Sequence, residues 1–75
     1  MPHVIVKFWP GKSQDQKRRL SEAITRAVET TLHCGQESVS VALEEVSARD
    51  WKERVYGPDI QARWGALSKK PGYEM

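Results

Sequence analysis

Hydrophobic and polar residues alternate along the first part of the chain in the pattern of a β-strand, over residues 3–9. The alternation assigns three residues to each face, Val4, Val6 and Phe8 on one and Ile5, Lys7 and Trp9 on the other. Pro10-Gly11 is a turn dipeptide and is predicted to end this strand.

A helical pattern follows the turn, over residues 14–34. Ser13 and Gln16 have the spacing of a capping box, which predicts where the helix begins. Apolar residues then recur at helical spacing as one stripe: Leu20, Ala23, Ile24, Ala27, Val28 and Leu32. The opposite face is predicted to be polar and to carry Lys17, Arg18, Glu22, Arg26 and Glu29. Gly35 is predicted to end the helix.

A second alternating segment, with Val39, Val41 and Leu43 on one face, predicts a second strand. Strand, long helix and strand form a βαβ unit, whose strands are parallel and whose crossover is right-handed in nearly all cases. Both edges of a two-stranded sheet are exposed, which favours pairing with another copy of the chain. The expected α/β fold is therefore a βαβ unit with parallel strands that dimerises into a four-stranded sheet backed by two helices.

The remaining chain shows neither a second long helix nor a further strand pattern. Capping and apolar spacings predict two short helices, over 47–54 and about 59–68, with a break at Gly57-Pro58 between them. The first short helix carries Trp51, and residues 69–73 are predicted to form a terminal turn or tail.

Composition restricts the class of protein. The chain has 75 residues, enough for a single domain over 1–75 that buries only ~60% of its unfolded surface, so oligomerisation is expected to add stability. The single cysteine, Cys34, excludes an internal disulfide and fits a reducing, cytoplasmic setting. The cysteine and histidine spacing predicts no metal site. No apolar run is long enough to cross a membrane, and the net charge of +2 is too small to indicate nucleic-acid binding.

Pro2 follows the initiator methionine and opens the first strand. Aminopeptidases remove methionine when the next residue is small, and removal of Met1 would leave a secondary amine at the edge of the sheet. An N-terminal amine has a pKa of about 7.7–8.0, which burial or a nearby cation lowers further. Such an amine can act as a general base near neutral pH. With Met1 retained, the same nitrogen would be an amide without basicity.

The order and spacing of four motifs resemble the 4-oxalocrotonate tautomerase family: Pro2 before a strand, Gly11-Lys12-Ser13, Asp15-Gln16-Lys17 before a long helix, and Ser38-Val39-Ser40-Val41. The ending, with Trp51 and Lys69-Lys70-Pro71-Gly72-Tyr73, is similar to the PptA-type subgroup of that family. Together the motifs extend over nearly the whole chain.

This resemblance implies an isomerase without a cofactor, which moves a proton between an enol and the carbon of a 2-keto acid. It implies Pro2 as the catalytic base, and Lys12, Ser40 and Trp51 as substrate-binding positions. Lys12 and Ser40 stand where the family usually has arginines, and Trp51 aligns with its aromatic wall. Because serine cannot pair with a carboxylate as an ion, we expect monocarboxylates such as phenylenolpyruvate to be preferred over dicarboxylates such as 2-hydroxymuconate. Three arginines are alternatives for the missing cation: Arg49, Arg54 and Arg63.

The resemblance also implies an oligomer, for which a homodimer is favoured and a hexamer is the alternative. Two other functions remain open from the residues. One is a dehalogenase-like relative of the same family, which would need an arginine pair to hold its substrate. The other is a non-enzymatic dimeric module that binds a partner protein, in which Pro2 is incidental. Retention of Met1 would favour that module.

Overall fold

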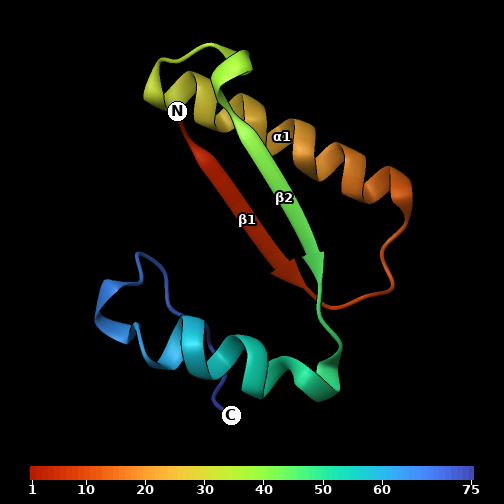
Figure 1. Ribbon diagram of the computed structural model, residues 1–75, viewed down its shortest axis with the longest axis vertical. Coiled ribbons are helices and arrows are strands. Elements are labelled where there is room, and N and C mark those ends of the chain that lie inside the picture. Colours follow the sequence, from red (N-terminus) through yellow and green to blue (C-terminus); the bar gives the residue numbers. More distant parts are fainter. The chain divides into compact units, whose positions relative to one another are not determined.

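Parallel strand pairing organises the first of the two units into which the chain divides. The computed structural model describes residues 1–75, and its two units are Met1–Glu45 and Val46–Met75. In the first unit, β1 (His3–Phe8) pairs in parallel with β2 (Ser40–Glu45), from His3 opposite Ser40 to Phe8 opposite Glu45. Figure 1 shows the two strands side by side, with the long helix running along them. The predicted βαβ unit with parallel strands is confirmed.

The long helix, α1 (Gln14–Leu32), begins at the predicted capping box. The Gln16 N–H donates to Ser13 Oγ at 3.0 Å, and the Ser13 N–H donates to Gln16 Oε1 at 2.9 Å. Two of the N–H groups that a helix leaves unpaired at its start are thereby satisfied. Neither α1 nor any other helix has both the length and the apolar character needed to cross a membrane.

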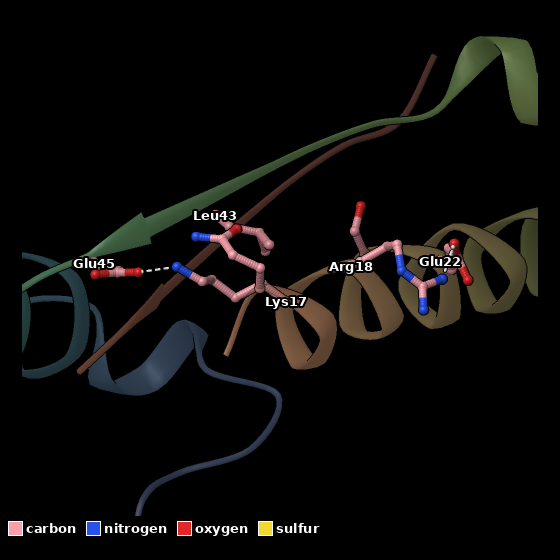
Figure 2. Close-up of a pocket in the computed structure, with 7 residues that line it drawn as sticks. Lys17, Arg18, Glu22, Leu43 and Glu45 are labelled. Atoms are coloured by element: carbon pink, nitrogen blue, oxygen red, sulfur yellow. Dashed lines mark hydrogen bonds and ion pairs between the residues drawn. The ribbon is translucent and has the colours of Figure 1, made fainter. Parts of the chain in front are cut away.

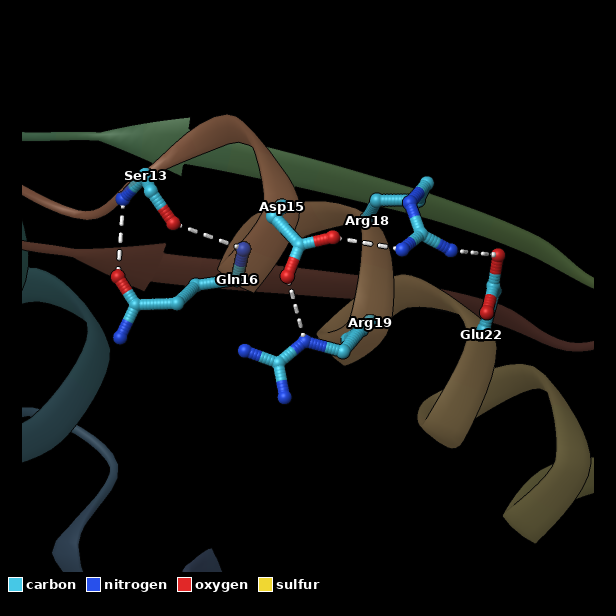
Figure 3. A network of polar contacts seen from close by, with 6 residues as sticks. All are labelled: Ser13, Asp15, Gln16, Arg18, Arg19 and Glu22. Atoms are coloured by element: carbon cyan, nitrogen blue, oxygen red, sulfur yellow. Dashed lines mark hydrogen bonds and ion pairs between the residues drawn. The ribbon is translucent and has the colours of Figure 1, made fainter.

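Ion pairs follow the capping box along the exposed surface of α1, as Figure 3 shows. Asp15 pairs with Arg18 at 2.6 Å and with Arg19 at 2.9 Å, and Arg18 also pairs with Glu22 at 2.9 Å. The hydrogen bonds to Asp15 and then to Glu22 raise the pKa of the Arg18 guanidinium above its ordinary value. Asp15 lies in the first turn of the helix, where a negative charge is favoured by the helix dipole.

The predicted end of the helix at Gly35 was wrong. The residue that adopts the left-handed conformation is His33, with φ of 55°, and its N–H donates to the carbonyl of Glu29. Histidine is among the non-glycine residues that are enriched at positive φ, so the helix can end two residues before the glycine. Gly35 instead precedes a short 3₁₀ helix, η1 (Gln36–Ser38), with an ordinary extended backbone.

The two faces of the sheet differ in what covers them. Lys17 reaches from α1 to pair with Glu45 at the end of β2, so α1 covers the face that carries Glu45. The register places three cross-strand pairs on the other face: His3 with Ser40, Ile5 with Ala42, and Lys7 with Glu44. No element of the first unit covers that face, and Ile5 is 52% exposed.

The apolar stripe predicted for the helix lies only partly against the sheet. Ile24 and Val28 are half-buried, whereas Leu20 is 39% and Leu32 is 61% exposed. Lys17, predicted on the polar face, is half-buried because it turns toward β2. No residue of the first unit is fully buried, so its apolar surface remains largely uncovered within that unit.

The second unit contains three short helices: η2 (Ala48–Asp50), η3 (Lys52–Gln61) and η4 (Trp64–Ala66). Ser47 caps the first of them, because its Oγ accepts a hydrogen bond from the Asp50 N–H at 3.3 Å. The three buried residues of the protein all lie in this unit: Val46, Val55 and Tyr56.

The predicted break at Gly57-Pro58 was wrong, and so was the helix predicted over 59–68. The π-helix η3 continues through Pro58 and ends at Gln61. In an α-helix the proline ring clashes with the carbonyl four residues earlier. In a π-helix the hydrogen bonds run to the carbonyl five residues earlier, as from the Ala62 N–H to the Gly57 oxygen at 3.0 Å, and the wider turn relieves that clash.

The capping box gives a test of the fold. We expect Ser13→Ala to lower the free energy of unfolding by about 1 kcal/mol, because the Gln16 N–H loses its acceptor. Chemical denaturation at one fixed protein concentration measures the loss. Ser13→Asp keeps an acceptor at the cap and should retain the stability of the parent chain. Equal losses in the two variants would contradict the role of the capping box.

Candidate active site

Pro2 lies directly before β1, at the point where the parallel pairing begins. Its carbonyl oxygen accepts a hydrogen bond from the Ser40 N–H at 3.1 Å, which ties it to the first residue of β2. Pro2 is half-buried, and Met1 before it is fully exposed. The backbone of Pro2 is thus held by the sheet, while Met1 before it is accessible.

Ser40 makes a second contact at the same end of the sheet. Its Oγ lies 2.6 Å from Nδ1 of His3, which is its partner in the strand register. The structure therefore brings Ser40 together with Pro2 and His3. The contact of His3 with Ser40 was not predicted from the sequence. The signal available was the parallel register itself, which depends on a pairing across 37 positions of sequence.

Lys12 lies at the opposite end of β1 from Pro2. It lines a hollow of about 210 Å³ beside the start of α1, together with Phe8, Gln16, Lys17 and Leu20. β1 has six residues, and a strand rises about 3.3 Å per residue, so the strand spans about 20 Å between Pro2 and the end at which Lys12 lies. A single copy of the chain does not bring Lys12 to Pro2.

Trp51 belongs to the second unit, where the C-terminal tail holds it. Its indole Nε1–H donates to the hydroxyl of Tyr73 at 3.0 Å. The Tyr73 ring in turn lies 5.8 Å from the ring of Tyr56, which is buried. The tail residue Lys70 also stands 5.7 Å from the ring centre of Trp64. The predicted wall residue is therefore oriented by contacts inside its own unit.

A larger hollow of about 490 Å³ lies between α1 and β2, and Figure 2 shows Lys17 reaching across it to Glu45. Leu43 contributes an apolar side chain to the hollow. Arg18 and Glu22, also on its lining, are paired with each other. Because the lysine and the arginine are both paired with acidic side chains, the hollow offers an anionic ligand little free positive charge. None of the residues predicted for the site lines it.

Metal ligands do not gather anywhere in the protein. No group of three or more histidine, cysteine or acidic side chains is placed so that it could hold a metal ion. Cys34 is a free, half-buried thiol after the end of α1. The groups with chemistry to offer beside Pro2 are the imidazole of His3 and the hydroxyl of Ser40.

The fold places the protein in a class of small βαβ proteins with known structures. TomN, a 4-oxalocrotonate tautomerase homologue in the tomaymycin biosynthetic pathway, superposes with a TM-score of 0.66 at 31% identity. The superposition covers 85% of this chain and 95% of TomN. The parallel βαβ unit of this chain thus has the fold of a 4-oxalocrotonate tautomerase homologue.

Comparison of the whole chain with known sequences identifies the family within this class. The family model for tautomerase enzymes matches residues 2–55. A probable tautomerase of Xylella fastidiosa (strain 9a5c) is 42% identical over 97% of this chain and 89% of its own length. Tautomerase PptA of Cronobacter sakazakii (strain ATCC BAA-894) is 41% identical over the full length of both chains. The chain belongs to the tautomerase family, whose members are isomerases, and the resemblance found in the sequence is confirmed.

Processing of the N-terminus gives a test of the site. We expect the intact mass of the expressed protein to be lower than that of the full sequence by one methionine residue, because Met1 is fully exposed and is followed by a small residue. Intact-mass spectrometry measures this directly. A variant with a bulky second residue, Pro2→Leu, should keep Met1. A parent chain that retains Met1 would leave Pro2 without an amine.

Proposed function

We propose that the protein is an enol–keto tautomerase for 2-keto acids, in which the amine of Pro2, freed by loss of Met1, is the general base. The observation that carries this proposal is the fixed position of Pro2, whose carbonyl is bound by the Ser40 N–H beside a fully exposed Met1. The family match, which starts at residue 2, supports the same assignment. Because the Pro2 amine belongs to the backbone, this hydrogen bond restrains the base itself.

The reaction needs one base that serves two proton transfers. The neutral Pro2 nitrogen takes the proton of the enol hydroxyl, and the electron pair of that O–H bond forms the carbonyl. The electrons of the carbon–carbon double bond then take the proton back from the Pro2 ammonium at the adjacent carbon. Such a shuttle works best when the pKa of the base lies near the working pH, which an N-terminal amine satisfies. The proline ring also restricts the direction of the nitrogen, which favours a fixed reactive geometry.

Substrate binding calls for a second copy of the chain. Because the length of β1, about 20 Å, separates Pro2 from the end of the strand at which Lys12 lies, a lysine that holds the substrate carboxylate at Pro2 comes from a neighbouring subunit. Exposed apolar side chains such as Ile5 and Leu20 support an assembly that covers them. A homodimer is favoured, and a hexamer is the alternative. Trp51 would then supply an aromatic wall that keeps water from the amine.

The substrate class follows from the charges near the amine. Lys12 supplies one cation, enough for one carboxylate, and Ser40 carries no charge. The Ser40 hydroxyl is engaged by His3, so any bond to substrate uses its remaining hydrogen-bonding capacity. Monocarboxylates such as phenylenolpyruvate are therefore favoured over dicarboxylates.

The proposal is tested first by ketonisation of phenylenolpyruvate with protein whose intact mass confirms loss of Met1. We expect a rate well above the buffer reaction. Pro2→Ala should lose most of this activity, about 10²-fold or more in kcat, because a flexible primary amine replaces a rigid secondary one. Lys52→Ala, which changes a lysine on the exposed surface of η3, should leave the rate unchanged. An unchanged rate in Pro2→Ala would remove Pro2 from the mechanism.

The selectivity is tested by Ser40→Arg. The added guanidinium can pair with a second carboxylate, so we expect kcat/KM for 2-hydroxymuconate to rise relative to phenylenolpyruvate, by about tenfold for one new ion pair in a partly enclosed site. The ratio is the relevant quantity, because loss of the bond to His3 can lower both rates together. Ser40→Gln, a long neutral side chain, is the control for size. A ratio unchanged from the parent enzyme would contradict this account of selectivity.

A further inference from the structure

Ser40 joins the start of β2 to two consecutive residues at the start of β1. Its N–H donates to the Pro2 carbonyl at 3.1 Å, and its Oγ lies 2.6 Å from the Nδ1 of His3. Both contacts lie at the open end of the sheet, where Met1 is fully exposed. The proposed base and its neighbour in sequence are thus held by one serine.

A chain terminus needs such restraint more than other parts of a fold. The first residues of a domain tend to fray unless they are tied down, and the amine of Pro2 has no side chain beyond its ring with which to hold itself. Its direction depends on the backbone of Pro2 and His3. If the first rung of the sheet opens, the amine moves away from the reacting atoms. A displacement of about 1 Å can reduce a rate by as much as 10²-fold.

The bond between His3 and Ser40 can persist whether or not the imidazole is protonated. In the neutral ring with its hydrogen on Nε2, the Ser40 hydroxyl donates to Nδ1. In the imidazolium, the Nδ1–H donates to Ser40 Oγ. The other charged side chains on this face of the sheet are those of Lys7 and Glu44, four residues further along the strands, and the Pro2 amine directly precedes His3 in the chain. A restraint based on geometry should therefore act over the whole working range of pH.

We propose that His3 and Ser40 are positioning residues, whose side-chain hydrogen bond holds the first rung of the parallel sheet closed and so fixes the Pro2 amine for proton transfer. This inference rests on the proposed function of Pro2. In this proposal His3 acts through the hydrogen bond that it makes with Ser40, and the charge of its imidazole has no role. It also gives the serine at the start of β2 a task beyond contact with substrate.

The kinetic test compares variants that remove or keep the bond, in protein free of Met1. His3→Leu and Ser40→Ala should each lower kcat for phenylenolpyruvate by about tenfold, between no effect and the 10²-fold cost of a full displacement, with KM nearly unchanged. His3→Asn should restore most of kcat, since its amide can occupy the place of Nδ1. The fold-loss in His3→Leu should be equal at pH 6 and pH 8. A loss confined to the lower pH, a rise in KM without a fall in kcat, or no restoration by asparagine would overturn the proposal.

Matched controls separate this restraint from general loss of structure. Ser38→Ala removes a serine hydroxyl two residues earlier, which donates instead to the Gly35 carbonyl at 2.8 Å. His33→Asn removes the other histidine, at a left-handed position that asparagine tolerates. Both controls should keep kcat within about twofold of the parent enzyme, the usual scatter for a substitution away from the reacting groups. A tenfold loss in the Ser38 variant would overturn a specific role for Ser40.

A second measurement does not depend on turnover. The Ser40 amide donates to Pro2, so its hydrogen exchange reports opening of the first rung. Exchange at Ser40 should be faster in His3→Leu than in the parent chain and near the parent value in His3→Asn. If exchange is faster in His3→Leu but the parent chain has no tautomerase activity, the proposed function is contradicted and the restraint by His3 and Ser40 is supported. Unchanged exchange in His3→Leu would overturn the restraint, whatever the activity.

Discussion

The parallel pairing of β1 with β2 is the constraint on which the first unit depends. Its register sets His3 opposite Ser40 and Phe8 opposite Glu45. The same register brings Glu45 within reach of Lys17 on α1 and so decides which face the helix covers. At the other end it brings Ser40 to Pro2. A shift by one residue would exchange the faces and separate the serine from the histidine.

The same unit leaves much of its apolar surface uncovered. None of its residues is fully buried, and large apolar side chains such as Ile5 and Leu32 remain more than half exposed. A chain of 75 residues has little interior to offer. In the proposed assembly, contact between copies buries more of this surface and brings the Lys12 of one chain to the Pro2 of another. The same contact between copies would then both stabilise the fold and complete the site.

In the chemistry proposed for this tautomerase, no side chain serves as the base. The base belongs to the backbone, so the protein must control the position of a chain end. The hydrogen bonds that converge on Ser40 suit that task, since one joins it to Pro2 and the other to His3. A site built in this way can change its substrate preference at the surrounding positions while its base stays unchanged. Its dependence on a single terminal rung of the sheet is the corresponding weakness.

Local chemistry determined much of this protein from the sequence alone. The alternation in β1, the capping box at Ser13 and the motif order that indicated the family each depend on neighbouring residues, and each is confirmed. Tertiary structure decided what depends on distant residues or on cooperative backbone geometry. His33, and not Gly35, adopts the left-handed conformation at the end of α1. The helix η3 continues through Pro58 because it adopts the wider π turn. The contact between His3 and Ser40 exists because two strands far apart in sequence meet in one register, which propensity and spacing do not encode.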